Sequence, residues 1–202
     1  MVDPVSSTGT DPILLLTNTG GAHYHELEST VRLRPSNKAD LNVSYVRSLA
    51  RGDLNTLTEV CVPFEQPVIR PNFVGNLPSN VPHRLITWGS FKIPWSVTAS
   101  PVLDVHSGFP CSAVDVQQNY AGAPNSRRFP TFFSLDLQLS KDFHVAFLPW
   151  WKNRVVRGTF RIYNLTNHAN PRDVYSNAAS PLFSSFTGFQ HRLFDAGLDI
   201  VF

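Results

Sequence analysis

The chain has 202 residues, with 17 Lys and Arg against 15 Asp and Glu, which gives a formal net charge of +2. So small an excess of positive charge gives no reason to propose nucleic acid as a partner. Charged residues make up 16% of the chain, whereas soluble domains average about 25%. The 15 Phe and 16 Pro also argue against a helical bundle, which favours Ala, Leu, Glu and Lys.

No segment has the pattern of a membrane-spanning helix or a secretory signal. The longest apolar runs, Ile13–Leu16 and Val145–Trp151, are far shorter than the ~20 residues that a spanning helix needs. Met1 to Thr10 lacks a basic stretch followed by an apolar core. Paired-Cys metal motifs, phosphate-binding glycine loops and Gly-x-Ser-x-Gly turns are also absent from the sequence. We therefore expect no enzyme activity, no bound metal and no cofactor.

Seven segments alternate between apolar and polar residues with the period of two that is typical of β-strands. The alternation is sharpest in the fifth, where Phe133, Leu135 and Leu137 oppose Ser134 and Asp136. It is weakest in the third, where Ile86 and Trp88 share a face with Arg84 and Lys92. The predicted strands are Tyr24–Arg34, Leu41–Ala50, Arg84–Ile93, Val97–His106, Phe133–Phe143, Arg154–Asn164 and Gln190–Phe202.

Short and long connections alternate strictly between these strands. The short ones are Pro35–Asp40, Pro94–Ser96 and His144–Asn153, and the long ones are Arg51–His83, Ser107–Phe132 and Leu165–Phe189. In an antiparallel meander this rhythm places all short turns at one end and all long loops at the other. Outer-membrane barrels have this asymmetry, with short periplasmic turns and long extracellular loops.

A tilted strand of about ten residues crosses the hydrocarbon layer of a membrane if its outer face is apolar and every backbone group is paired. Aromatic side chains favour the headgroup level at either surface, and five of them lie at the predicted short-turn end: Trp95, Phe143, Trp150, Trp151 and Phe202. Alternating strands also describe a soluble β-sandwich. The connection rhythm, the clustered aromatics and the C-terminus favour the membrane interpretation.

The C-terminus ends on Phe202, with Ile200 two positions before it and Gly197 five positions before it. This pattern resembles the terminal signal by which outer-membrane barrels are recognised for insertion. It implies the barrel-assembly machinery as a partner.

A series of motifs, in family order over about residues 20–202, resembles TonB-dependent outer-membrane receptors, in particular the branch with a carboxypeptidase-regulatory-like N-terminal module. The resemblance lies in the series and its order, not in any single motif. The motifs are Tyr24-His25-Glu26-Leu27, Asn42-Val43-Ser44-Tyr45, Pro82-His83-Arg84-Leu85, Ile93-Pro94-Trp95, Ser107-Gly108-Phe109-Pro110, Phe132 to Lys141 and Ile162 to Pro171.

The resemblance implies an antiparallel transmembrane barrel of ~22 strands, of which this chain supplies about seven or eight. Residues 1–20 are then a partial strand or loop at a truncated start, and residues 21–202 are C-terminal barrel strands. Because no plug or energy-coupling box maps onto the sequence, we expect a longer receptor whose missing N-terminal part contacts the TonB complex. The implied function is nutrient uptake across a Gram-negative outer membrane, with the long loops outside and the C-terminus in the periplasm.

The alternation also predicts a register on the lumen-facing side. A fifth–sixth hairpin centred on its short turn sets Asp136 opposite Arg161, and Ser140 opposite Arg157. Symmetric closure of the sixth and seventh strands sets Asp195 opposite Arg161, and Asp199 opposite Arg157. Arg161 is then expected between two carboxylates. A one-residue slip would turn these Arg side chains to lipid, at a cost of ~2–4 kcal/mol at the midplane.

Three further candidates are weaker. His23 and His25 share one strand face, which suggests either a metal site or plain strand residues at the loop rim. Asp104 and His106 share an inward face, but no Ser nucleophile has a definable place beside them. Cys61 and Cys111 both fall in long loops at the same end, where a disulfide or two unpaired thiols are the alternatives.

Two other functional classes stay open. One is a small closed outer-membrane pore of eight strands, with Pro12–Asn18 supplying the first. The other is a secreted soluble β-sandwich used for binding or adhesion.

Overall fold

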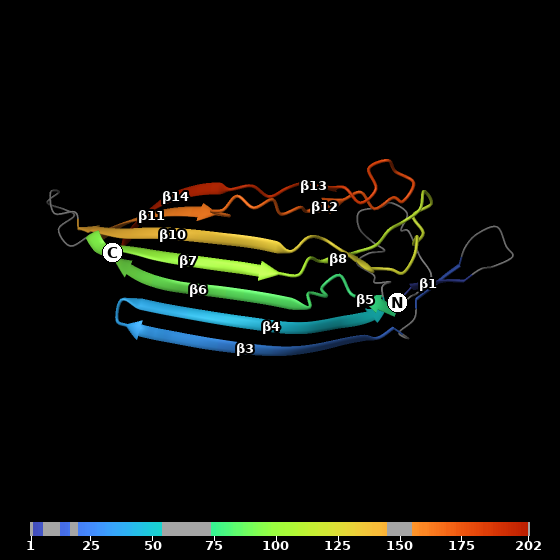
Figure 1. Cartoon of the computed structure of the whole chain (residues 1–202), viewed down its shortest axis with the longest axis horizontal. Coiled ribbons are helices and arrows are strands. Elements are labelled where there is room, and N and C mark those ends of the chain that lie inside the picture. Colours follow the sequence, from blue (N-terminus) through green and yellow to red (C-terminus); the bar gives the residue numbers. More distant parts are fainter. Residues whose placement is uncertain (1, 6–12, 17–19, 54–73, 145–154, 202) are drawn as a thin grey trace.

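The structure is a computed structural model, which describes residues 2–5, 13–16, 20–53, 74–144 and 155–201. Seven long strands form its main sheet (Figure 1). They are β3 (Ala22–Ser36), β4 (Ala39–Asp53), β6 (His83–Ile93), β7 (Val97–His106), β10 (Phe132–His144), β11 (Val155–Tyr163) and β14 (Leu193–Val201). All seven predicted strands are confirmed, with bounds that differ by at most a few residues.

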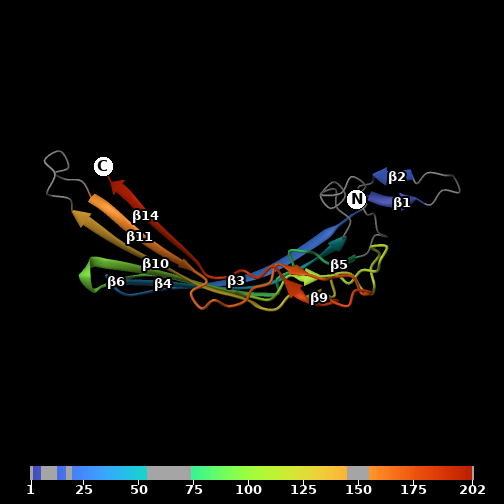
Figure 2. The same cartoon turned by 90° about the horizontal axis from the view of Figure 1, so that it is seen from above.

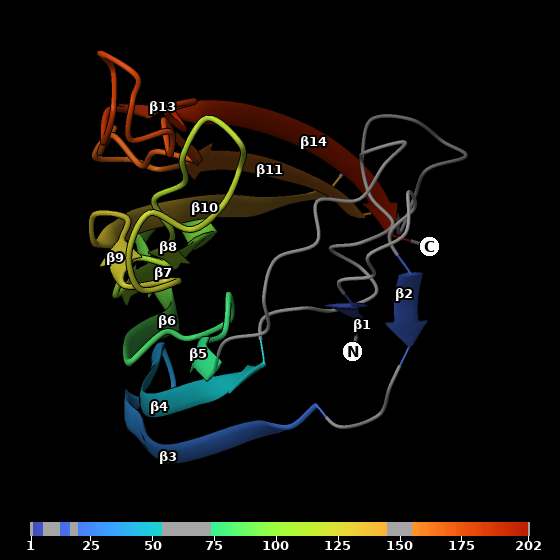
Figure 3. The ribbon, with the colours of Figure 1, turned by 90° about the vertical axis from the view of Figure 1, so that its right-hand side faces the viewer.

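Each long strand pairs antiparallel with the next along the chain, in the order β14-β11-β10-β7-β6-β4-β3. The predicted antiparallel meander is therefore confirmed. Within the described residues β3 and β14 each have one long neighbour, so the sheet is open and no closed barrel forms. Viewed along its strands in Figure 3, the sheet follows an open arc.

The remaining strands are short and belong to the connections. β5 (Val74–Asn76) extends the sheet beside the end of β4, whereas β8 (Pro110–Cys111) pairs with β9 (Arg127–Arg128) and β12 (Asp173–Val174) with β13 (Phe186–Thr187). Near the N-terminus, β1 (Val2–Val5) pairs with β2 (Ile13–Leu16). Because β2 pairs with β1, it does not join the long sheet as an eighth meander strand.

Turns and loops lie at opposite ends of the sheet, as Figures 1 and 2 show. At the turn end, β3 and β4 meet across Asn37 and Lys38, and β6 passes to β7 through the tight turn η1 (Pro94–Ser96). Trp95 and Ser96 both have positive φ there, at 64° and 57°, as in the two-residue turns that suit twisted hairpins. The Trp95 side chain is 82% exposed, in agreement with its predicted place at the turn end.

The two faces of the sheet differ in chemistry. Directly opposed residues share a face, so the register β3–β4–β6–β7–β10–β11–β14 defines one apolar and one polar face. Among the described residues no large apolar side chain on this face is buried, and exposure is greatest on the edge strands, where Leu27 is 71% exposed and Leu198 is 78% exposed. Small polar side chains on the opposite face are buried instead, among them Asn42, Ser44, Ser134 and Thr159.

This burial pattern is the reverse of a water-soluble core. Among the described residues the buried hydrophobic side chains are Ala50, Ala113 and Val114, and Ala113 and Val114 belong to a loop rather than to the long strands. Among the described residues, Figure 2 shows the main sheet as one layer with no second sheet stacked on it. Those residues therefore do not bury the apolar face between two layers.

Candidate functional site

The polar face of the sheet carries a ladder of charged and amide side chains across β10, β11 and β14. Arg161 on β11 donates from Nε to Gln138 Oε1 at 3.0 Å and from Nη1 to Asp195 Oδ2 at 2.7 Å. Arg157, two side chains along the same face, binds Asp142 with two hydrogen bonds of 2.7 and 2.9 Å. Each guanidinium thus joins neighbouring strands.

The predicted register between β11 and β14 is confirmed. Arg161 lies opposite Asp195, and Arg157 lies opposite Asp199. Exposed ion pairs of this kind contribute ~0–1 kcal/mol each to stability. Their larger effect is on register, because a slip of one residue moves every side chain to the other face.

The predicted register between β10 and β11 is wrong by two residues. Gln138, not Asp136, lies opposite Arg161, and Asp142, not Ser140, lies opposite Arg157. A shift of two keeps every side chain on its predicted face, so polarity alone does not choose between the two registers. The observed register gives Arg157 a bidentate carboxylate, which the predicted partner Ser140 does not offer.

Asp136 takes a structural role instead. Its Oδ1 accepts hydrogen bonds from Ser134 Oγ at 2.7 Å and from the backbone N–H of Asn164 at 2.8 Å. It therefore ties β10 to the residue that follows β11. Arg161 lies between an amide and a carboxylate, and not between two carboxylates as predicted.

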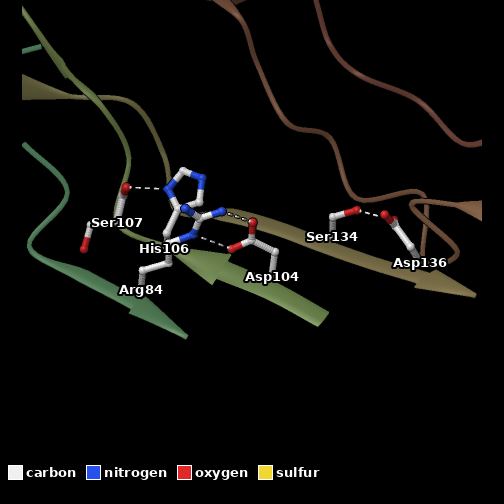
Figure 4. Close-up of polar contacts among 6 residues, drawn as sticks. All are labelled: Arg84, Asp104, His106, Ser107, Ser134 and Asp136. Atoms are coloured by element: carbon white, nitrogen blue, oxygen red, sulfur yellow. Dashed lines mark hydrogen bonds and ion pairs between the residues drawn. The ribbon is translucent and has the colours of Figure 1, made fainter. Parts of the chain in front are cut away.

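A second group of charges lies on β6 and β7 (Figure 4). Arg84 binds Asp104 through Nε at 3.2 Å and Nη2 at 2.8 Å. His106 Nδ1 donates to the carbonyl of Ser107 at 2.8 Å, since a carbonyl oxygen only accepts. Asp104, His106 and Ser134 share the polar face but each has a different partner, so their contacts do not form a nucleophile–base–carboxylate relay.

The polar face is hollowed at this point. A groove of about 480 Å³ is lined by residues of β3, β4 and β6 together with loop residues, among them Glu28, Ser48, Arg84 and Trp88. Glu28 Oε1 accepts from Ser44 Oγ at 2.9 Å and Thr30 Oγ1 at 3.1 Å. The groove therefore presents both charges and hydrogen-bonding groups along the sheet.

An aromatic cleft of about 290 Å³ lies where the long loops leave the sheet. His106 stacks on Phe132 with ring centroids 4.6 Å apart, and Phe109 meets the His106 ring edge-on at 5.2 Å. Gly108 is required beside it, because a Cβ at that position would lie 1.8 Å from the Phe129 carbonyl oxygen. Arg172 and Gln190 supply polar groups at the same cleft.

Buried amides hold these loops to the sheet. Asn170, which is 3% exposed, accepts from the Phe133 N–H at 3.1 Å and donates to the Phe133 carbonyl at 2.8 Å. Arg128 donates to the Asn80 carbonyl at 2.8 Å, to Asn80 Oδ1 at 3.0 Å and to the Gly108 carbonyl at 3.0 Å. These contacts join loops that are distant in sequence.

Sequence reasoning missed the roles of Gln138 and Asp142, the Arg84–Asp104 pair and the aromatic cleft. Alternation assigns a side chain to a face but not to a partner. The segments Ser107–Pro110 and Ile162–Pro171, singled out by their motifs, do contribute to the cleft through Phe109 and Asn170.

The other predicted site residues are distributed as follows. His23 and His25 lie opposite Arg51 and Leu49, and the described residues contain no group of three metal-ligand side chains. Gly197 and Ile200 lie on β14, opposite Thr159 and Val156; Phe202 lies outside the described residues.

Of the two cysteines in the predicted disulfide, the structure describes Cys111 alone. Cys111 is a half-buried free thiol on β8, and burial raises the pKa of that thiol. Cys61 lies outside the described residues, so their disulfide stays a prediction.

No helix in the described part of the chain has the length and apolarity to cross a membrane. No family model, curated protein or solved structure matches the chain.

Proposed function

We propose that the chain forms part of the wall of an outer-membrane β-barrel in a TonB-dependent nutrient receptor. In this role its apolar face contacts lipid acyl chains and its polar face lines the lumen. The long loops lie outside the cell and the turns lie in the periplasm. Further strands and a plug, supplied by the rest of the receptor, close the barrel and contact the TonB complex.

The uncovered apolar face is the observation that carries the proposal. Large aliphatic and aromatic side chains on β3, β4, β11 and β14 are 40% exposed or more, including Leu27, Leu49, Phe160 and Leu198. On a soluble protein, an exposed apolar surface that extends over several strands marks a place where a partner binds. A bilayer covers such a face without any protein contact, because acyl chains are as apolar as the side chains.

The two sheet edges support a larger barrel. β3 and β14 each leave one row of backbone groups without a strand partner in the described sheet. Hydrocarbon does not tolerate unpaired backbone groups, so a membrane sheet must close on itself or on further strands. The TonB-dependent assignment rests in addition on the motif series.

The loop-end cleft suits a role in ligand capture. Aromatic faces around His106 and Phe132 favour a flat or apolar group, and Arg172 beside them favours an anionic one. Metal chelates, vitamins and glycans are the substrate classes that the family resemblance implies, and the cleft does not choose among them.

Accessibility of spin labels tests the membrane role. Single cysteines at Leu137, Gln138, Leu139 and Ser140, in a chain lacking its two native cysteines, are labelled after insertion into lipid vesicles, where copies of the chain can pair their open edge strands. We expect oxygen, which partitions into lipid, to reach the labels at Leu137 and Leu139. A water-soluble nickel complex should reach those at Gln138 and Ser140, because successive strand residues face opposite sides.

Matched labels at Tyr175 and Leu182, in a long loop, serve as aqueous controls. Equal nickel accessibility at all four β10 positions would contradict the proposal. A soluble β-sandwich would differ in another way, because its buried apolar positions would be shielded from oxygen and nickel alike, and it would fold without lipid and remain in the aqueous phase after detergent partitioning.

A further inference from the structure

On three adjacent strands, the apolar face becomes basic at the long-loop end. Along β4 from the turn, the outward positions begin with Leu41 and Val43 and end with Arg47 and Arg51. On β3 the same face runs from Leu33 to His25 and His23, and on β6 it runs from Ile93 to His83.

The register brings these residues together. His23 lies opposite Arg51 on β4, and Arg47 lies opposite His83 on β6. Arg47, Arg51, His23 and His25, here called the basic rim, are all exposed, and so is His83 beside Arg47. The exposed side chains of Leu27 and Leu49 lie among them on the same face.

Arg47 is held in place by its neighbours. Its Nη1 lies 2.9 Å from His83 Nε2, and because a guanidinium only donates, Nε2 accepts. The Nδ1 of His83 then carries the proton and donates to Tyr45 Oη at 2.7 Å. This series of hydrogen bonds uses one N–H of Arg47 and leaves the rest of the guanidinium without a hydrogen-bond partner among the described residues.

Acidic side chains on these strands lie mostly elsewhere. Glu26 and Glu28 of β3 point to the opposite, polar face, opposite Ser48 and Val46. Asp53, at the end of β4, accepts a hydrogen bond from the Gly21 N–H. Within the described residues neither Arg47 nor Arg51 forms an ion pair, unlike Arg34, Arg84, Arg157 and Arg161.

We propose that the basic rim binds the phosphate groups of anionic lipid in the outer leaflet, directly above the acyl chains that contact Val31 and Leu33. The inference rests on the proposed membrane role. It follows from the order of residues along each strand: an apolar band first, then Arg and His at the level where headgroups lie. Guanidinium groups bind phosphate oxygens through paired N–H donors.

The rim is distinct from the charges of the polar face. There, Arg and Asp neutralise one another across strands, as Arg157 and Asp142 do. On the rim two guanidinium groups are left for an external anion. An apolar surface on the same strands, continuous with the rim, favours an amphipathic lipid over free phosphate in solution.

The test of this proposal measures the binding of lipid A by native mass spectrometry. The protein is the full chain, folded in detergent. We expect R47Q/R51Q to weaken binding on the order of thirtyfold, since two Arg charges near a membrane surface are removed. The matched control is R32Q/R34Q, which removes two Arg charges from the polar face of the same hairpin and should leave binding unchanged.

His83 is a positioning residue in this scheme. H83A should weaken lipid A binding in the wild-type chain but have no further effect in an R47Q background. A purely structural role for His83 would lower binding in both backgrounds.

Unchanged lipid A binding by R47Q/R51Q would overturn the proposal, as would equal binding of dephosphorylated lipid A. The spin-label pattern on β10 is measured for the same variants. If it alternates while binding does not depend on the rim, the headgroup site fails and the membrane role stands; if alternation is lost in the unsubstituted chain, the membrane role itself fails.

Discussion

Asn164 has no exposed surface and a positive φ of 52°, immediately after the end of β11. Its Nδ2 donates to the His168 carbonyl at 2.8 Å and to the Gln190 carbonyl at 3.2 Å, and its Oδ1 accepts from the His168 N–H at 3.0 Å. Asn is among the few residues that adopt a left-handed conformation at low cost. One residue therefore provides both the turn and the contacts that close the loop.

We expect N164A to lower the free energy of unfolding by roughly 3 kcal/mol. The substitution leaves buried polar groups unpaired, and it places alanine, which is strained at positive φ, in a left-handed backbone conformation. Urea titration of the chain folded in detergent measures the change. N164G separates the two causes, since Gly tolerates the backbone conformation but makes no side-chain hydrogen bond. N167A, at an exposed residue with φ of 54°, is the matched control; an equal loss there would contradict the role of burial.

Cys111 provides a test that depends on pH. Burial raises the pKa of its thiol, and the positive charge of Arg127 lowers that pKa by a smaller amount. In a C61S background, alkylation of Cys111 by iodoacetamide should therefore have its pH midpoint above that of the same chain in urea. Because the folded pKa is the higher one, the thiol's contribution to stability is complete below the unfolded pKa and is lost as pH rises through the folded pKa. A midpoint at or below that of the unfolded chain would show that the thiol is not desolvated.

At the scale of the strands, the sequence predicts well which segments form strands and which face each side chain lies on. It predicts less well which residues of neighbouring strands lie opposite one another. Val97–His106 has the predicted bounds, and β3 begins at Ala22 instead of Tyr24. Alternation is a local property, so any strand with one apolar face reveals it. Alternation leaves the β10–β11 register open by steps of two, and the sequence of residues 145–154 contains no Asn-Gly or Asp-Gly pair that would mark the centre of a hairpin turn.

The difference between local pattern and long-range pairing also explains which parts of the candidate sites could be predicted. The Arg161–Asp195 pair was predictable because the β11–β14 loop happens to close symmetrically. The cleft was not, since His106, Phe132 and Asn170 come from separate segments whose approach depends on loop contacts. Alternation carries no information on such contacts.

Cross-linking tests the β10–β11 register directly. In a chain without its native cysteines, we expect D142C/R157C to form a disulfide under mild oxidation and S140C/R157C to form little. Asp142 and Arg157 are directly opposed, and opposed residues have Cβ atoms about 4.5–5.5 Å apart, whereas diagonal neighbours are farther. Preferential cross-linking of S140C/R157C would favour the hairpin centred one residue earlier.

For the whole molecule, the arrangement of the edges distinguishes a barrel segment from a small closed pore. β3 and β14 lie at opposite ends of the strand order, and Figure 3 shows them separated by the opening of the arc. β2, which would supply an eighth strand in the small-pore alternative, pairs with β1 instead. A sheet in this state needs further strands to satisfy its edges in lipid.

We expect the 202-residue chain, folded by itself in detergent, to migrate at the same position on a detergent gel with and without boiling. A closed barrel resists the detergent because every strand is paired on both sides, whereas an open sheet is attacked from its two edges. A closed eight-stranded barrel run on the same gel is the control and should shift on boiling. A compact band of this chain that converts to a slower one on boiling, with no other polypeptide present, would show that its edges do meet. It would transfer the assignment from a receptor wall to a small self-contained pore.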